Sequence, residues 1–266
     1  MNLRLLKTLM KEQLLPALAA FSVALIALLI SCMVFAGNTA IEHRIQIWIY
    51  GCEPLDFFLP LLASLPFSFT LYCKKSDGFL HYSSTRMSRK RYVAHHMLAG
   101  FLLCVAGIAL TYFCGLLFSE YILPFEATPG YHSGLESYVF GVWMVSHPVA
   151  FGLVWCLWKG FNAGLFTLFG YGLALYTENI FIVSVAPFVY FVAENLITSL
   201  LQITEYSVVT SIALNRLSPN SMHVYNYFAG TISFVIVATV IVLALSRREK
   251  SRYEVKAHKK QAMEKG

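Results

Sequence analysis

Long apolar runs alternate with short polar segments along this chain. Several runs contain about 20 apolar residues, which at about 1.5 Å per helical residue cross a hydrocarbon core of roughly 30 Å. The sequence lacks the period-2 alternation of membrane β-strands. Because backbone polar groups in lipid must be satisfied within their own segment, the pattern predicts an all-α integral membrane protein.

The pattern predicts a single six-span transmembrane domain over residues 1–246. The expected spans are about 14–35, 54–72, 97–119, 160–176, 180–201 and 227–246. Pro60 and Pro66 each remove a backbone donor from the second span, so we expect a kink there.

The stretch 149–176 is too long for one upright helix and contains Lys159. We therefore divide it into an outer interfacial or re-entrant helix over about 141–158 and the fourth span, with Lys159 extending outward to the interface. A second outer connection, residues 202–226, also contains an amphipathic portion.

Composition and charge fix the expected orientation. The chain is 58% hydrophobic and 13% charged, whereas an ordinary soluble domain carries about 25% charged residues. Of the 20 Lys and Arg residues, three lie in residues 1–13, six in 73–96 and eight in 247–266. Because positive charge concentrates in cytosolic segments, we expect both termini inside, with 247–266 as a basic cytosolic tail.

Sequence signatures of catalysis are missing. The chain contains no G-x-x-x-x-G-K-[ST] phosphate loop, no H-E-x-x-H and no G-x-S-x-G. Its six cysteines include no C-x-x-C pair, and the adjacent Ser146 and His147 are weak evidence for a nucleophile, which needs a converging base and orienting group. We expect neither a catalytic residue nor a metal site, and no cofactor bound by this chain.

The basic segment between the second and third expected spans has a recognisable pattern. The string SDGFLHYSSTRMSRKRYVAHHMLAG (76–100) resembles the cytosolic loop of ABC-2 type transporter permeases, in which an acidic residue and a glycine precede a short amphipathic helix and an S-R-x-x-Y cluster follows it. The matching residues are Asp77, Gly78, Phe79, Ser88, Arg89 and Tyr92.

The resemblance implies that Asp77 to Thr85 is a coupling helix that docks on a cytosolic ABC ATPase subunit, with Phe79, Leu80 and Tyr82 as apolar contacts and Arg86, Arg89 and Tyr92 beside them. Aromatic anchors with a charged rim fit such a docking role. The alternative is a basic loop that only sets topology or touches anionic lipid.

The same resemblance implies the partners and the activity. ATP and Mg would be bound by the partner ATPase, and this permease would pair with a second copy or a paralogue in a bacterial cell membrane. Its other contacts would be membrane lipids, with no nucleic acid. The expected activity is export of a substrate, for example an amphipathic or antimicrobial peptide.

Glu194, beside Asn195, is the only carboxylate that we place deep in a span. It lies 15 residues from the expected inner turn at Asn179, about 22 Å along a helix. An ionisable group at that depth is a functional hypothesis, most simply as part of a substrate cavity. The alternative is a hydrated carboxylate where the helix nears the outer surface.

Two further functions remain open. A non-transporting immunity or scaffold protein would need no ATPase. An intramembrane enzyme would need polar residues that converge within the spans, where we place one carboxylate, Glu194.

Overall fold

The computed structural model describes residues 3–78 and 88–263. Six of its helices are long and apolar enough to cross a membrane, which confirms the expected all-α fold with six helices of spanning length and supports a multi-pass membrane protein. They are α1 (Leu3–Asn38), α2 (Ile45–Ser76), α4 (Arg89–Tyr121), α6 (Pro148–Tyr176), α7 (Ile180–Leu200) and α9 (Asn226–Met263).

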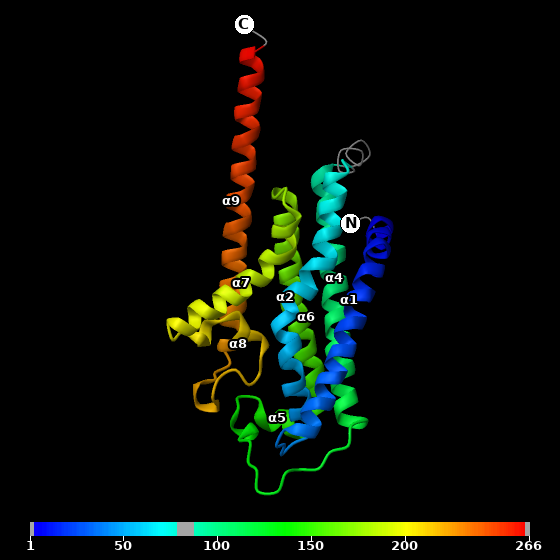
Figure 1. Ribbon diagram of the computed structural model, residues 1–266, viewed down its shortest axis with the longest axis vertical. Helices are drawn as coiled ribbons and strands as arrows, with labels where there is room; N and C mark the ends of the chain where they lie inside the picture. The colour runs from blue at the N-terminus through cyan, green and yellow to red at the C-terminus, as the bar shows by residue number, and fades with distance from the viewer. Residues whose placement is uncertain (1–2, 79–87, 264–266) are drawn as a thin grey trace.

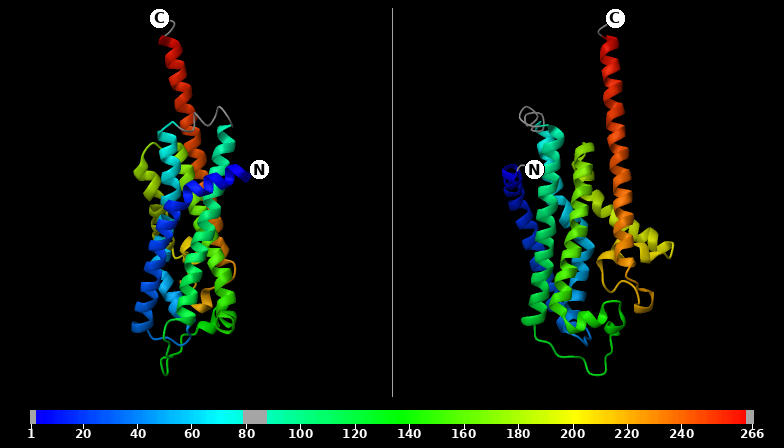
Figure 2. Two further views of the ribbon diagram at one scale, coloured as in Figure 1. Left: turned by 90° about the vertical axis from the view of Figure 1, so that its right-hand side faces the viewer. Right: turned by 180° about the vertical axis from the view of Figure 1, so that it is seen from behind.

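Helices α1, α2, α4 and α6 form the main bundle (Figure 1). Helix α7 packs against α2 and α6, and α9 packs against α6. Helix α7 lies obliquely, whereas α9 runs along the long axis of the molecule and extends beyond the bundle. The first turns of α1 lie across α4 (Figure 2). Leu6 and Leu9 pack there against Tyr92 and Val93.

The start of α1, the end of α2, the start of α4 and the end of α9 all lie toward one end of the bundle, which we call the basic end (Figure 1). The opposite end, the loop end, carries residues 122–147 with α5 (Gly141–Ser146). The connection from α7 to α9 also lies toward it and contains α8 (Val208–Ile212).

Burial differs strongly among the six helices. In α2 and α6, 56% of the most apolar stretch is buried within the protein, against 17% in α7 and in α9. Many large apolar side chains of α1, α7 and α9 are therefore exposed, including Val23, Leu196 and Val240. In a membrane protein these surfaces face lipid, while α2 and α6 form the centre.

The structure corrects the expected division of the fourth span. The break lies at Pro148, where a proline fits the first helical turn because its missing N–H would be unpaired there. From Pro148 to Tyr176, α6 is one helix, and Lys159 lies inside it. The side chain of Lys159 is 3% exposed, so the prediction that it extends outward to the interface is wrong.

Helix α2 is longer than the second expected span. It begins at Ile45 and runs to Ser76 through Pro54, Pro60 and Pro66. The added first turns bury the side chains of Trp48 and Cys52 in the bundle, where Asp56 is also buried.

Candidate functional site

A buried ion pair lies at the centre of the bundle. The Lys159 ammonium on α6 donates to both oxygens of the Asp56 carboxylate on α2, at 2.7 and 2.6 Å. The Tyr112 hydroxyl on α4 donates to the same carboxylate at 2.7 Å. The Lys159 ammonium also lies 4.5 Å from the centre of the Tyr112 ring, a cation–π distance. Three helices thus converge on two opposite charges.

The surrounding backbone holds this charge cluster in place. The Trp48 indole N–H donates to the Tyr112 carbonyl at 3.0 Å, which fixes α2 against α4. Next to Lys159, a side chain at Gly160 would come within 2.5 Å of the Val105 carbonyl oxygen. Glycine at this position therefore lets α6 approach α4 closely beside the ion pair.

A pocket of about 280 Å³ opens near the ion pair, on the side of the loop end. We call it the loop-end pocket. Asp56 and Glu53 of α2 line it together with Phe191 and Asn195 of α7, and Arg216 lines it from the connection after α8. The Arg216 guanidinium donates to the Asn195 side-chain oxygen at 2.8 Å, and Asn215 donates to Glu53. Both signs of charge therefore line the pocket.

The two predicted cavity residues occupy different places. Asn195 lines the loop-end pocket, as a cavity residue would. Glu194 instead binds the start of α8: its carboxylate accepts hydrogen bonds from the Ser207 hydroxyl at 2.9 Å and the Val208 N–H at 3.2 Å. A carboxylate at a helix N-terminus satisfies backbone donors there, so this geometry holds α8 against α7.

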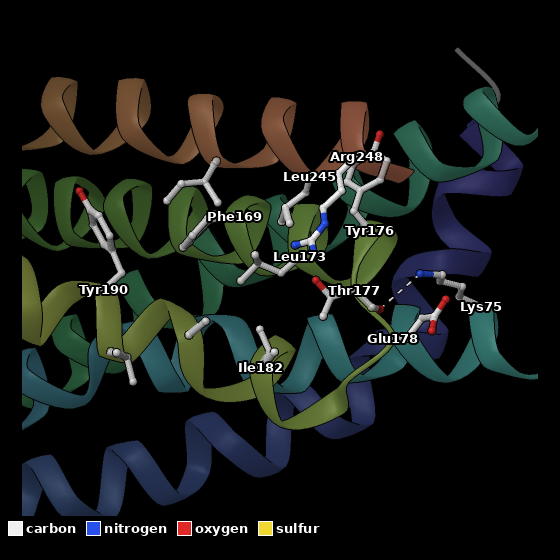
Figure 3. Close-up of a pocket in the computed structure, with 13 residues that line it drawn as sticks. Lys75, Phe169, Leu173, Tyr176, Thr177, Glu178, Ile182, Tyr190, Leu245 and Arg248 are labelled. Atoms are coloured by element: carbon white, nitrogen blue, oxygen red, sulfur yellow. Dashed lines mark hydrogen bonds between the residues drawn. The ribbon is translucent and has the colours of Figure 1, made fainter. Parts of the chain in front are cut away.

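A second pocket, of about 600 Å³, lies between α6, α7 and α9 toward the basic end (Figure 3). We call it the basic-end pocket. Figure 3 shows apolar and aromatic side chains, among them Phe169 and Tyr190, at one extremity, and Lys75 and Glu178 at the other. The Lys75 ammonium donates to the Thr177 carbonyl at 3.3 Å and to the Ala174 carbonyl at 3.4 Å.

An aromatic cluster lies between the two pockets. Phe234 of α9 has its ring centre 4.3 Å from that of Phe166 and 5.4 Å from that of Tyr190. Phe166 in turn lies 5.9 Å from Phe191. Because Tyr190 lines the basic-end pocket and its neighbour Phe191 lines the loop-end pocket, this cluster separates them.

Only part of the predicted coupling segment can be placed. Asp77 caps α2 with its N–H on the Cys73 carbonyl at 2.9 Å, and Gly78 follows with φ of 71°, a left-handed conformation that favours glycine after a helix. Arg89 is the first residue of α4. Tyr92 is buried, and Lys74 donates to its hydroxyl at 3.3 Å. Four residues lie outside the described ranges: Phe79, Leu80, Tyr82 and Arg86.

The ion pair between Asp56 and Lys159 was not predicted from the sequence. Asp56 lies inside the second expected span, so Glu194 is not the only carboxylate deep in a helix. The available signal was the presence of one acidic and one basic residue, Asp56 and Lys159, in two otherwise apolar runs. Such residues are rare within membrane helices and usually pair with one another.

Comparison with known proteins gives no identification: no family model, curated protein or solved structure matches this chain.

Proposed function

We propose that this protein is the membrane-spanning subunit of an ATP-driven exporter whose ATPase is a separate cytosolic protein. In this proposal the basic end faces the cytosol of a bacterial cell, where positive charge concentrates. The segment from Asp77 to Tyr92 joins two membrane helices at that end and would receive the ATPase. A second copy or a paralogue would complete the transporter, and ATP and Mg would bind to the ATPase.

The observation that carries the proposal is the pair of pockets on opposite sides of one aromatic cluster. Glu53 and Lys75, which line different pockets, are 22 residues apart on α2, about 33 Å at helical rise. Export requires sites that open alternately toward the two sides of the membrane, with a barrier between them. One pocket toward each end of the bundle, with Phe166, Phe191 and Phe234 between the two, supports such an arrangement.

The same geometry gives less support to the two alternatives. A scaffold or immunity protein has no need of pockets toward both ends. An intramembrane enzyme needs polar groups that are available to a substrate, whereas Lys159 and Asp56 bind each other and Tyr112. Transport of an amphipathic substrate is therefore the function that we favour.

The test is capture of the ATPase. Full-length protein purified from bacterial membranes in mild detergent should retain a stoichiometric subunit that carries a G-x-x-x-x-G-K-[ST] loop and hydrolyses ATP. The variant Phe79→Asp should lose this subunit, because an added carboxylate opposes burial of the segment in a protein groove. Ala40→Asp is the matched control, since it adds the same charge at the exposed loop end.

Retention of the ATPase by Phe79→Asp would contradict the coupling role of this segment. Purified protein without any such subunit would contradict the exporter itself and favour a scaffold. Hydrolysis of a lipid or peptide by the chain alone would favour the enzyme.

A further inference from the structure

The basic-end pocket has the polarity of an amphipathic ligand. Its walls are apolar side chains from three helices, including Leu173 of α6, Ile182 of α7 and Leu245 of α9. At the basic end the pocket is lined by the charged residues Lys75, Glu178 and Arg248. Figure 3 shows Arg248 directed toward Leu173 and Thr177. One extremity of the pocket therefore suits hydrocarbon and the other suits a polar headgroup.

The charge at the polar extremity favours an anion. Among the described residues that line this pocket, Arg248 and Lys75 are the two cations, and Glu178, which is exposed, is the one carboxylate. Lys75 also binds the last carbonyls of α6 at Ala174 and Thr177, where the helix carries partial negative charge. The N-terminus of α7 begins nearby at Ile180 and adds partial positive charge. Arg248 is thus the side chain best placed to meet a headgroup.

Size and position agree with a lipid-like molecule. A volume of about 600 Å³ lies within the range of roughly 300–1,000 Å³ that is typical of small-molecule sites. The pocket lies between α7 and α9, the two helices with the least buried apolar stretches. A molecule with one acyl chain could therefore enter sideways from the bilayer.

We propose that the basic-end pocket binds an amphipathic anion with a single acyl chain and a phosphate or carboxylate headgroup. Arg248 and Lys75 hold the headgroup, and the apolar side chains of α6, α7 and α9 surround the chain. That this ligand is the substrate which the exporter takes from the cytosolic leaflet rests on the proposed function. Binding itself requires no ATPase.

The test uses a photoreactive lysophosphatidic acid, with a diazirine in its acyl chain, added to the full-length protein in neutral-lipid nanodiscs. Peptide mass spectrometry should locate the label on α6, α7 and α9 around the pocket. Arg248→Gln should lower the yield about fivefold, as expected for one basic side chain at an anionic headgroup. Arg247→Gln removes the same charge from an exposed neighbour that does not line the pocket, and should leave the yield unchanged.

A second pair of variants tests the apolar part. Ala186 lines the pocket, so Ala186→Phe should fill it and abolish specific labelling. Val192→Phe places the same ring on an exposed part of α7 outside the pocket and should have no effect. Since Arg248→Gln changes an exposed side chain, it remains informative if Ala186→Phe fails to fold.

Four results would overturn the proposal. The first three are equal labelling by the zwitterionic lysophosphatidylcholine analogue, equal loss in both arginine variants, and label outside the pocket. Competition by glycerol 3-phosphate as strong as that by unlabelled lysophosphatidic acid would assign the site to a free phosphate, which also overturns it. If labelling fails while the ATPase is still captured, only this inference falls. If labelling succeeds but no ATPase is captured, only the exporter proposal is contradicted.

Discussion

Asp56 and Lys159 are charges that a bilayer excludes, and each is tolerated because the other lies within hydrogen-bond distance. Taking two ions out of water is costly, and their attraction offsets that cost only while both are present. Tyr112 adds a third contact to the carboxylate. The pair therefore ties α2, α4 and α6 together at the cost of making each member dependent on the other.

We expect Lys159→Met to lower the free energy of unfolding by about 3–5 kcal/mol, because it leaves the Asp56 carboxylate buried and unpaired. The double variant Asp56→Asn with Lys159→Met should recover most of that loss, since no buried charge remains. Thermal or denaturant unfolding in detergent micelles measures both. Lys11→Met, at an exposed position, is the control. A double variant no more stable than Lys159→Met alone would show that the pair is not coupled.

A second residue-scale prediction concerns Glu42, in the loop between α1 and α2. Its carboxylate accepts hydrogen bonds from the Ser133 hydroxyl and N–H, both at 2.7 Å, and from His132 at 3.2 Å. These bonds, that from the Ser133 hydroxyl foremost, lower the pKa of Glu42 from 4.5 to about 2. Because the folded-state pKa is depressed, the ion contributes stability above about pH 4.5 that is lost as the pH falls toward 2.

Glu42→Gln should therefore unfold at a lower temperature than the natural protein above about pH 4.5, and the difference should shrink as the pH approaches 2. Thermal scans in detergent between pH 2 and 7 measure it. Glu126→Gln, at an exposed position before the turn at Gly130, controls for loss of one carboxylate. A difference that stayed constant down to pH 2 would mean that the ionised form contributes nothing.

At the scale of elements, apolar runs predict that a helix exists better than they predict where it ends. The count of six helices follows from run length alone. The end of α2 at Ser76 has a local sequence signal in Gly78, since glycine readily adopts the left-handed conformation that follows the helix. Pro148 is a comparable local signal for the start of α6. The predicted boundary was nevertheless placed at Lys159, because a single charged residue in an apolar run resembles a residue at the membrane interface. Its partner Asp56 is 103 positions away.

The close packing of α4 and α6 gives an element-scale prediction. An added methyl group at Gly160 would come 2.5 Å from the Val105 backbone oxygen, so one helix must shift. Gly160→Ala should therefore lower the free energy of unfolding by about 1–3 kcal/mol, in the range of overpacked cores. Gly37→Ala, also in a helix, has no atom within 4 Å of the added carbon and should be neutral or slightly stabilising. Equal effects of the two would show that helix propensity, not packing, decides.

At the scale of the whole molecule, the candidate site is mostly a product of tertiary structure. Asn195, expected in a substrate cavity, lines the loop-end pocket, and binding of a substrate there stays a prediction. However, the loop-end pocket also needs α2, α8 and Arg216, and the basic-end pocket needs Lys75 and Arg248, which are 173 positions apart in the sequence. No periodicity or motif connects positions so distant. Glu194 was also predicted to lie in the cavity, but its carboxylate instead binds the start of α8.

Orientation in the membrane is the property on which the proposed exporter depends most. The basic end must face the cytosol if a cytosolic ATPase is to reach the segment from Asp77 to Tyr92. We expect a membrane-impermeant maleimide to label Glu126→Cys in intact cells, and to label Asp77→Cys only after the membrane is opened. Both positions are exposed, so accessibility to water is matched.

In both variants Cys73 and Cys114 are replaced by serine, because they are partly exposed and could react with the maleimide. The other four cysteines are buried and are left in place. The charge distribution favours this result, since residues 1–13, 73–96 and 247–266 hold 17 of the 20 Lys and Arg. The reverse pattern, with Asp77→Cys labelled in intact cells, would put the proposed docking segment outside. A cytosolic motor could then not act on this protein, and the exporter proposal would have to be abandoned.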